Sequence, residues 1–184
     1  MPVQIGGSVH DFSDPTKFLA DCHRRIEMFL GSLEAVATVI DQPLTEETRR
    51  ALDGALRYFR EAAPKHNADE EESLFPRMRG IRDAAAQSAV AKIEKLEEEH
   101  RWAAPLHAEV ERLGAIYLSG GSLSETEVEG FRKAVSELGP MYREHIRVEE
   151  DVVFPAAARM LSRDEQAAVG EEMAARRSAR NSAS

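Results

Sequence analysis

Apolar residues recur at intervals of three and four along four long stretches of the chain, which is the spacing of one buried helical face. The first stretch begins near Pro15 and ends at Pro43. The second begins near Thr45 and ends at Phe75-Pro76, and Pro64 lies inside it. Because proline removes a backbone donor and clashes with the preceding turn, we expect a bend or break at Pro64. Each stretch predicts an amphipathic helix.

The third stretch begins after Asp83 and ends at Gly120-Gly121, and we expect Pro105 to kink it. The fourth opens with Ser124-Glu125-Thr126-Glu127, the pattern of a capping box, and runs to Phe154-Pro155. These two stretches predict a second pair of long amphipathic helices.

A shorter fifth helix is predicted to start at a second capping box, formed by Ser162 and Glu165, and to end at about Arg177. Residues 178–184 are small and polar, and we expect a disordered tail there. No stretch shows the sustained alternation of a β-strand. The predicted fold class is therefore all-α, an up-down antiparallel four-helix bundle with a short C-terminal fifth helix, in a single domain over residues 1–177.

Composition and charge narrow the class of function. A chain of 184 residues fits one domain with a sizeable core, and its net charge of −9 gives no general footprint for nucleic acid or an anionic membrane surface. Cys22 is the only cysteine, the N-terminus lacks a basic region followed by an apolar run, and no apolar stretch approaches the length of a bilayer span. We therefore expect a cytoplasmic protein that binds neither nucleic acid nor membrane.

One short motif occurs twice. His66 and Glu70 precede Phe75-Pro76 with the same spacing with which His145 and Glu149 precede Phe154-Pro155, 79 residues later. On an α-helix four residues turn about 400°, so each His and its Glu lie on one face. By the same geometry Glu71 and Glu150, five residues after each His, should point about 140° away from that face. The two copies together supply two imidazoles and two carboxylates.

A further histidine precedes each copy at a similar distance. His23 lies 43 residues before His66, and His100 lies 45 residues before His145. Each predicted long helix then carries one inward histidine, and in a bundle the four can meet at one level of the core. Imidazole nitrogens and carboxylate oxygens suit iron or manganese, whereas the chain has no thiolate set for a cysteine-type zinc site.

Each of these features also has a simpler interpretation. A single inward histidine is more often a hydrogen-bonded core residue, and an acidic run is more often a solvated face. The matched spacing in both copies favours a metal site, because an inward carboxylate needs a metal, a proton or a cationic partner. The candidate ligands are His23, His66, Glu70, His100, His145 and Glu149.

These motifs resemble the hemerythrin-like, HHE cation-binding family, and the resemblance covers about residues 10–175. It implies an up-down four-helix bundle around a non-haem di-iron centre. By this resemblance the four histidines are terminal ligands, and Glu70 and Glu149 bridge the irons. An oxo or hydroxo group would complete the bridge, and each iron would keep an open or water-filled position.

The chain departs from the oxygen-carrying hemerythrins, which resemble it but place a His-x-x-x-His pair on the third helix. Here Ala104 lies four residues beyond His100. His107, seven residues beyond, lies about 20° off the same face but about 10 Å along the axis. It is a candidate additional ligand, although a position beside the ligands or on the surface is favoured.

We therefore expect a di-iron protein that senses, scavenges or detoxifies dioxygen, nitric oxide or peroxide, in oxidative or nitrosative stress. These small molecules are the expected partners, and whether the protein is an enzyme is left open. The alternatives are a peroxidase- or catalase-like oxidoreductase, a protein of iron storage, delivery or iron-centre repair, and a metal-free helical interaction module.

Overall fold

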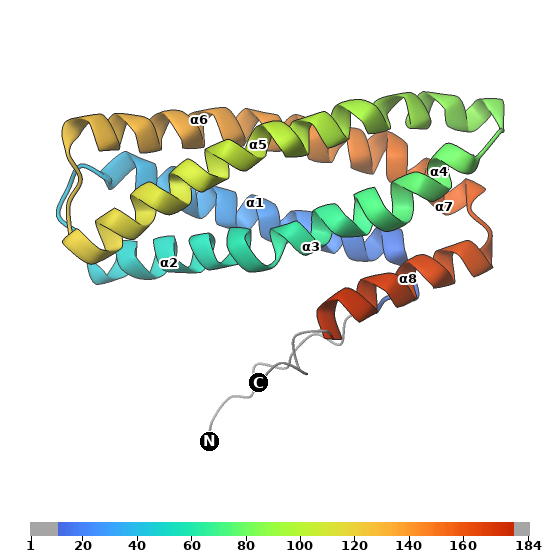
Figure 1. Cartoon of the computed structure of the whole chain (residues 1–184), viewed down its shortest axis with the longest axis horizontal. Coiled ribbons are helices and arrows are strands. Elements are labelled where there is room, and N and C mark those ends of the chain that lie inside the picture. Colours follow the sequence, from blue (N-terminus) through green and yellow to red (C-terminus); the bar gives the residue numbers. More distant parts are fainter. Residues whose placement is uncertain (1–10, 179–184) are drawn as a thin grey trace, which may run out of the picture.

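The computed structural model describes residues 11–178, and all regular secondary structure in that range is helical. Four columns run lengthwise and alternate in direction along the chain (Figure 1). The first column is α1 (Pro15–Val39). The second is built from four consecutive segments, namely α2 (Glu46–Glu61), α3 (Ala63–Ala68), the π-helical turn η1 (Asp69–Leu74) and α4 (Phe75–Gly80).

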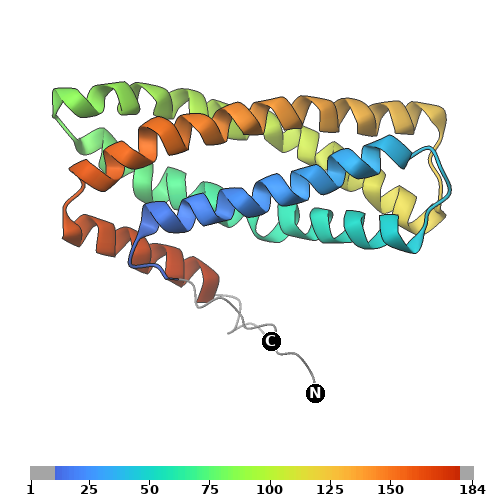
Figure 2. The same cartoon turned by 180° about the vertical axis from the view of Figure 1, so that it is seen from behind.

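The other two columns follow a short 3-10 turn, η2 (Ala84–Ala86). The third column is α5 (Gln87–Gly120), and the fourth consists of α6 (Glu125–Val148), the π-helical turn η3 (Glu149–Val153) and α7 (Phe154–Met160). Outside the columns, α8 (Arg163–Ser178) packs against α1 and η1 at one end of the bundle (Figure 2). The predicted all-α bundle with a short C-terminal fifth helix is confirmed.

Polar caps fix the helix starts that the sequence predicts. Asp14 accepts the backbone N–H of Lys17 at the start of α1, and Thr45 accepts that of Thr48 at the start of α2. Both predicted capping boxes form, Ser124 with Glu127 before α6 and Ser162 with Glu165 before α8. Each cap satisfies a backbone donor that has no partner inside its helix.

Prolines have different effects in different columns. The second column breaks between α2 and α3 with Pro64 in the first turn of α3, as predicted, whereas α5 runs on through Pro105. The prediction that Phe75-Pro76 and Phe154-Pro155 end their helices is wrong, since α4 continues to Gly80 and α7 to Met160. Each proline follows a π-helical turn and occupies the start of a new α-helical segment, where its missing N–H costs nothing.

The predicted tail lies almost wholly outside the described residues. Residues 179–184 are not described, but Ser178 is the last residue of α8, so the tail does not begin at 178. Near this end the buried carboxylate of Asp69 in η1 binds two arginines of α8, with Oδ1 3.0 Å from Arg176 Nη1 and Oδ2 2.6 Å from Arg177 Nη2. These bonds tie α8 to η1.

The core consists of two apolar clusters separated by a polar layer. In α1, Phe18 and Leu19 belong to one cluster and Ile26 and Leu30 to the other, and His23 lies between them. The other columns divide at the same level, and the buried polar side chains of that layer are His23, His66, Glu70, His100, His145 and Glu149. No helix within residues 11–178 is long and apolar enough to cross a membrane.

Candidate metal centre

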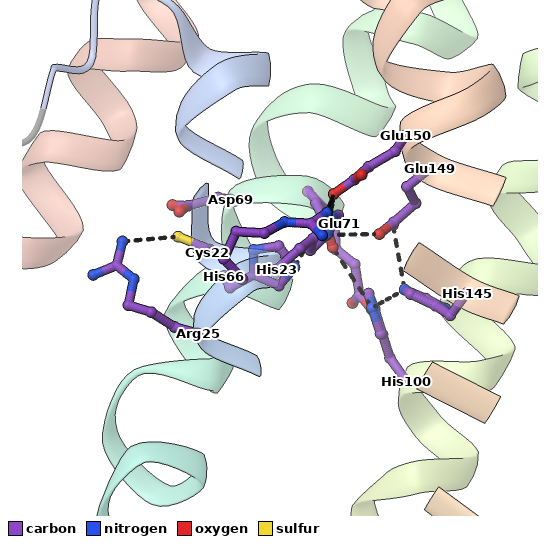
Figure 3. A network of polar contacts seen from close by, with 12 residues as sticks. Cys22, His23, Arg25, His66, Asp69, Glu71, His100, His145, Glu149 and Glu150 are labelled. Atoms are coloured by element: carbon purple, nitrogen blue, oxygen red, sulfur yellow. Dashed lines mark hydrogen bonds and ion pairs between the residues drawn. The ribbon is translucent and has the colours of Figure 1, made fainter. Parts of the chain in front are cut away.

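The six predicted ligands converge in the polar layer, although they come from six different segments. His23 lies on α1, His66 on α3 and His100 on α5, while His145 lies in the last turn of α6. Glu70 and Glu149 lie in the two π-helical turns, η1 and η3. All six side chains are buried, and Figure 3 shows His23, His66, His100, His145 and Glu149 pointing toward one another.

The imidazoles form two pairs, and both carboxylates reach both pairs. Oε1 of Glu70 lies 3.2 Å from Nε2 of His66 and 3.9 Å from Nε2 of His23, whereas its Oε2 lies 3.6 Å from Nε2 of His100. Glu149 has the mirrored arrangement, with Oε2 3.1 Å from Nε2 of His23 and Oε1 3.3 Å from Nε2 of His145. Each carboxylate therefore directs one oxygen to each pair of histidines.

These atoms make two groups that can each surround one ion. One group is His23, His66, Glu70 and Glu149, and the other is Glu70, His100, His145 and Glu149; within each, the ligand atoms lie within 4.8 Å of one another. The two groups share both glutamates. Two histidines in each group and two shared carboxylates suit a bridged pair of ions such as iron or manganese.

Several polar atoms of the layer have no hydrogen-bond partner among the described residues. Both oxygens of Glu70, both oxygens of Glu149 and Nε2 of His23 are fully buried, and none has a hydrogen-bond partner among the described residues. An unpaired buried carboxylate is costly, because burial removes the water that stabilises its charge. The unpaired lone pairs of this cluster therefore fit metal ions between them.

Local charges point to the same conclusion. Burial, with repulsion from Glu149, raises the pKa of Glu70 well above its ordinary value. Burial would also raise the pKa of Glu149, but the neighbouring His145 and His23 hold it below its ordinary value. Burial lowers the pKa of His66, whereas Glu149 and Glu99 outweigh burial at His145 and raise its pKa to about 9. Two carboxylates so close together can both be ionised only if cations lie beside them.

The π-helical turns explain how the ligands reach this layer. In η1 the N–H of Phe75 donates to the carbonyl of Glu70, and in η3 the N–H of Phe154 donates to the carbonyl of Glu149, five residues earlier in each case. Proline follows directly, and it could not donate to the α-helical partner four residues before it. The sequence reasoning missed both turns, although the repeated Phe-Pro marked their position.

Outer carboxylates orient three of the four histidines. Nδ1 of His100 lies 2.7 Å from Oε1 of Glu71, and Nδ1 of His23 lies 2.9 Å from Oε1 of Glu150. Nδ1 of His145 lies 2.9 Å from Oε2 of Glu99. A carboxylate on the far nitrogen fixes the tautomer and leaves Nε2 free to bind a metal.

The sequence did not predict the three outer carboxylates, Glu71, Glu99 and Glu150. Glu71 and Glu150 directly follow Glu70 and Glu149, and from α-helical geometry we expected both side chains to point away from the site. The repeated Glu-Glu pair was the signal for them. His66 differs from the other histidines, because its Nδ1 is buried without a hydrogen bond among the described residues.

His107, Cys22 and two aromatic residues lie outside the two groups. Nε2 of His107 lies 2.8 Å from the hydroxyl of Tyr142, and His107 belongs to neither group of ligand atoms among the described residues. Tyr142 contacts His145 with ring centroids 6.4 Å apart, whereas Trp102 is 46% exposed and does not line the layer. Cys22 is buried and lies 3.7 Å from an Arg25 nitrogen (Figure 3).

Comparison with known proteins agrees with this geometry. The sequence model of the hemerythrin HHE cation binding domain matches residues 14–157, which include all six clustered side chains. The chain is also 27% identical over 168 residues to an uncharacterised protein of Haemophilus influenzae (strain Rd), an alignment that covers 90% of this chain and 91% of that protein.

Proposed function

Because this chain belongs to the hemerythrin HHE cation-binding family, and its buried histidines and glutamates can hold metal ions, we propose that it carries a non-haem di-iron centre that reacts with or senses dioxygen, nitric oxide or peroxide. The observation that carries this proposal is the pair of shared carboxylates. Glu70 and Glu149 each direct one oxygen to each histidine pair, so both can bridge two ions.

The donor set favours iron or manganese over other metals. Each position offers two imidazole nitrogens and two carboxylate oxygens, and the only cysteine lies outside both groups. Sites with two histidines, carboxylates and open positions are typical of non-haem iron that reacts with small molecules. Bound iron would supply redox chemistry and a place for a diatomic ligand or peroxide. His107 bonds to Tyr142, which leaves the ligand count at four protein atoms for each ion.

The surrounding residues would control this chemistry. Glu71, Glu99 and Glu150 hold the Nδ1 protons of their histidines, so the histidines stay in the tautomer that presents Nε2. The two apolar clusters close the layer above and below, which excludes bulk water from the ligands. As part of the proposal, the protein works in the cytoplasm, where Cys22 stays reduced.

Metal analysis of protein expressed with ample iron tests the proposal. We expect about two irons per chain and an absorption band after air oxidation that changes when azide is added. Glu70→Ala and Glu149→Ala should each lose most of the iron. Glu72→Ala is the matched control, because its side chain lies in the same turn as Glu70 but is 67% exposed.

Two results would contradict the proposal. Only trace metal in the wild-type protein would remove its basis. We expect dioxygen to oxidise the reduced centre, and we expect peroxide to be consumed faster than by free iron. A stable, reversible dioxygen adduct would contradict the proposed reaction or sensing and would indicate oxygen carriage instead.

A further inference from the structure

A hydrogen-bonded pair of side chains connects the metal layer with the outside of the bundle. The hydroxyl of Tyr142 on α6 lies 2.8 Å from Nε2 of His107 on α5, and Tyr142 is only 6% exposed. The Tyr142 ring contacts the ring of His145 edge to face at 6.4 Å. The phenol therefore lies between a metal-binding histidine and a histidine that binds no metal.

His107 leads from the phenol to a surface pocket. Its ring lies 4.6 Å from that of Phe59, and both line a pocket of about 180 Å³ between α2 and α5. Arg60 and Glu111 also line this pocket, and they form an ion pair of 2.6 Å. Protons and small reductants in solvent can reach the neighbourhood of His107 there without crossing the core.

The tautomer of His107 decides the direction of this hydrogen bond. Burial lowers the pKa of His107 to about 4, so its imidazole is neutral at pH 7 and one ring nitrogen can accept a hydrogen bond. We assign the O–H of Tyr142 as the donor and Nε2 of His107 as the acceptor, which places the imidazole proton on Nδ1.

We propose that Tyr142 is a one-electron donor to the metal centre and that His107 accepts its proton. The inference rests on the proposed function, because the oxidant is a metal centre that hydrogen peroxide has oxidised. In this step the O–H bond of Tyr142 breaks, one electron passes to the metal, and the proton forms an N–H bond at Nε2 of His107. The products are a neutral tyrosyl radical, an imidazolium ion and a metal centre reduced by one electron.

The other oxidisable aromatic residues lack this arrangement. The hydroxyl of Tyr58 donates to the carbonyl of Cys22 at 3.3 Å, and that of Tyr117 donates to the carbonyl of Gln42 at 2.9 Å. A backbone carbonyl is too weak a base to take the proton of an oxidised phenol. Trp102 is 46% exposed. With only three tyrosines and one tryptophan in the chain, a radical can be assigned by substitution.

The first test needs no metal. Long-range proton–nitrogen NMR spectra of the metal-free protein at pH 7 should show a neutral His107 with its proton on Nδ1. Tyr142→Phe should shift the Nε2 resonance, and Tyr58→Phe should leave it unchanged. A protonated His107, or a proton on Nε2, would overturn the proposed direction of transfer.

The second test is the radical itself. The iron-loaded protein is mixed with hydrogen peroxide, freeze-quenched and studied by electron paramagnetic resonance. We expect a tyrosyl signal that narrows when the tyrosine rings are deuterated. Tyr58→Phe and Tyr117→Phe should keep it, and Tyr142→Phe should abolish it. His107→Gln should lose most of it, because an amide can accept the hydrogen bond but cannot take the proton.

Iron content, measured on the same samples, separates this inference from the proposed function. Wild-type protein that holds iron and consumes peroxide without a Tyr142 radical refutes the inference and leaves the proposed function standing. Protein without iron refutes the proposed function. A radical that persists in Tyr142→Phe, or that is unchanged in His107→Gln at equal iron content, also refutes the inference.

Discussion

Glu70→Gln should affect the metal-free and metal-bound forms in opposite directions. The glutamate side chain is wholly buried, both its oxygens lack hydrogen bonds among the described residues, and its pKa is raised by burial. In the metal-free protein the amide removes a buried ionisable group, which should stabilise the fold by about 1–3 kcal/mol. For a chain of this length that is a rise in Tm of about 2–12 °C.

The same substitution should greatly weaken metal binding. Glu70 offers one oxygen to each histidine pair, so its charge serves both ions. Removing one partner of a buried charge interaction costs about 3–5 kcal/mol, which is more than a hundredfold in affinity. Chelator competition measures this loss, and Glu72→Gln in the same turn should change neither the affinity nor the Tm.

The pH dependence of the stability of the metal-free protein tests whether Glu70 destabilises the empty bundle. Because the pKa of Glu70 is raised in the folded state, the metal-free wild type should lose stability as pH rises above the unfolded value of about 4.5. Glu70→Gln should remove part of this slope. If the metal-free variant instead melts below the wild type in chelator at pH 7, Glu70 stabilises the empty bundle and the argument from its unpaired oxygens is wrong.

Three further predictions follow from the surroundings of the ligands. The pKa of His145 is raised to about 9, so a metal must displace its proton at pH 7. The metal affinity measured by chelator competition should therefore rise about tenfold per pH unit from pH 7 and level off near pH 9. A metal affinity that does not depend on pH would contradict this. Glu71→Ala and Glu150→Ala should each lower metal affinity about 10–100-fold through loss of the outer carboxylates, and Asp151→Ala on the surface serves as their control. Asp69→Ala should lower the free energy of unfolding by about 3–5 kcal/mol, because it removes the buried carboxylate that both Arg176 and Arg177 bind. A denaturant melt that matches the wild type would show that this carboxylate does not hold α8 in place.

The sequence predicted the bundle and the six clustered side chains for a specific physical reason. A four-residue spacing fixes the angle between His66 and Glu70, and the apolar periodicity fixes which face turns inward. The caps at Thr45 and Ser124 follow from local chemistry in the same way.

What could not be predicted depends on contacts between columns or on departures from α-helical geometry. Glu99 lies on α5 and its carboxylate contacts His145 on α6. Spacing within one helix cannot reveal such a contact between two helices. The expectation that Glu71 and Glu150 point away assumed 100° per residue, and both residues lie in π-helical turns, where that angle is smaller. The hydrogen bond of His107 with Tyr142 likewise needs the packing of α5 against α6.

The repeated π-helical turn carries information about how this chain originated. Each half of the chain, residues 11–83 and 84–178, contains two columns, two of the four clustered histidines, one of the two shared glutamates and a π-helical turn that contains this glutamate. Each half therefore offers both histidines of one candidate metal group, and its glutamate belongs to both groups. The simplest history is duplication of a two-helix ancestor that already carried the bulge and worked as a homodimer about a twofold axis. The present chain retains that symmetry, so two separately expressed halves should have the complementary surfaces to rebuild one centre.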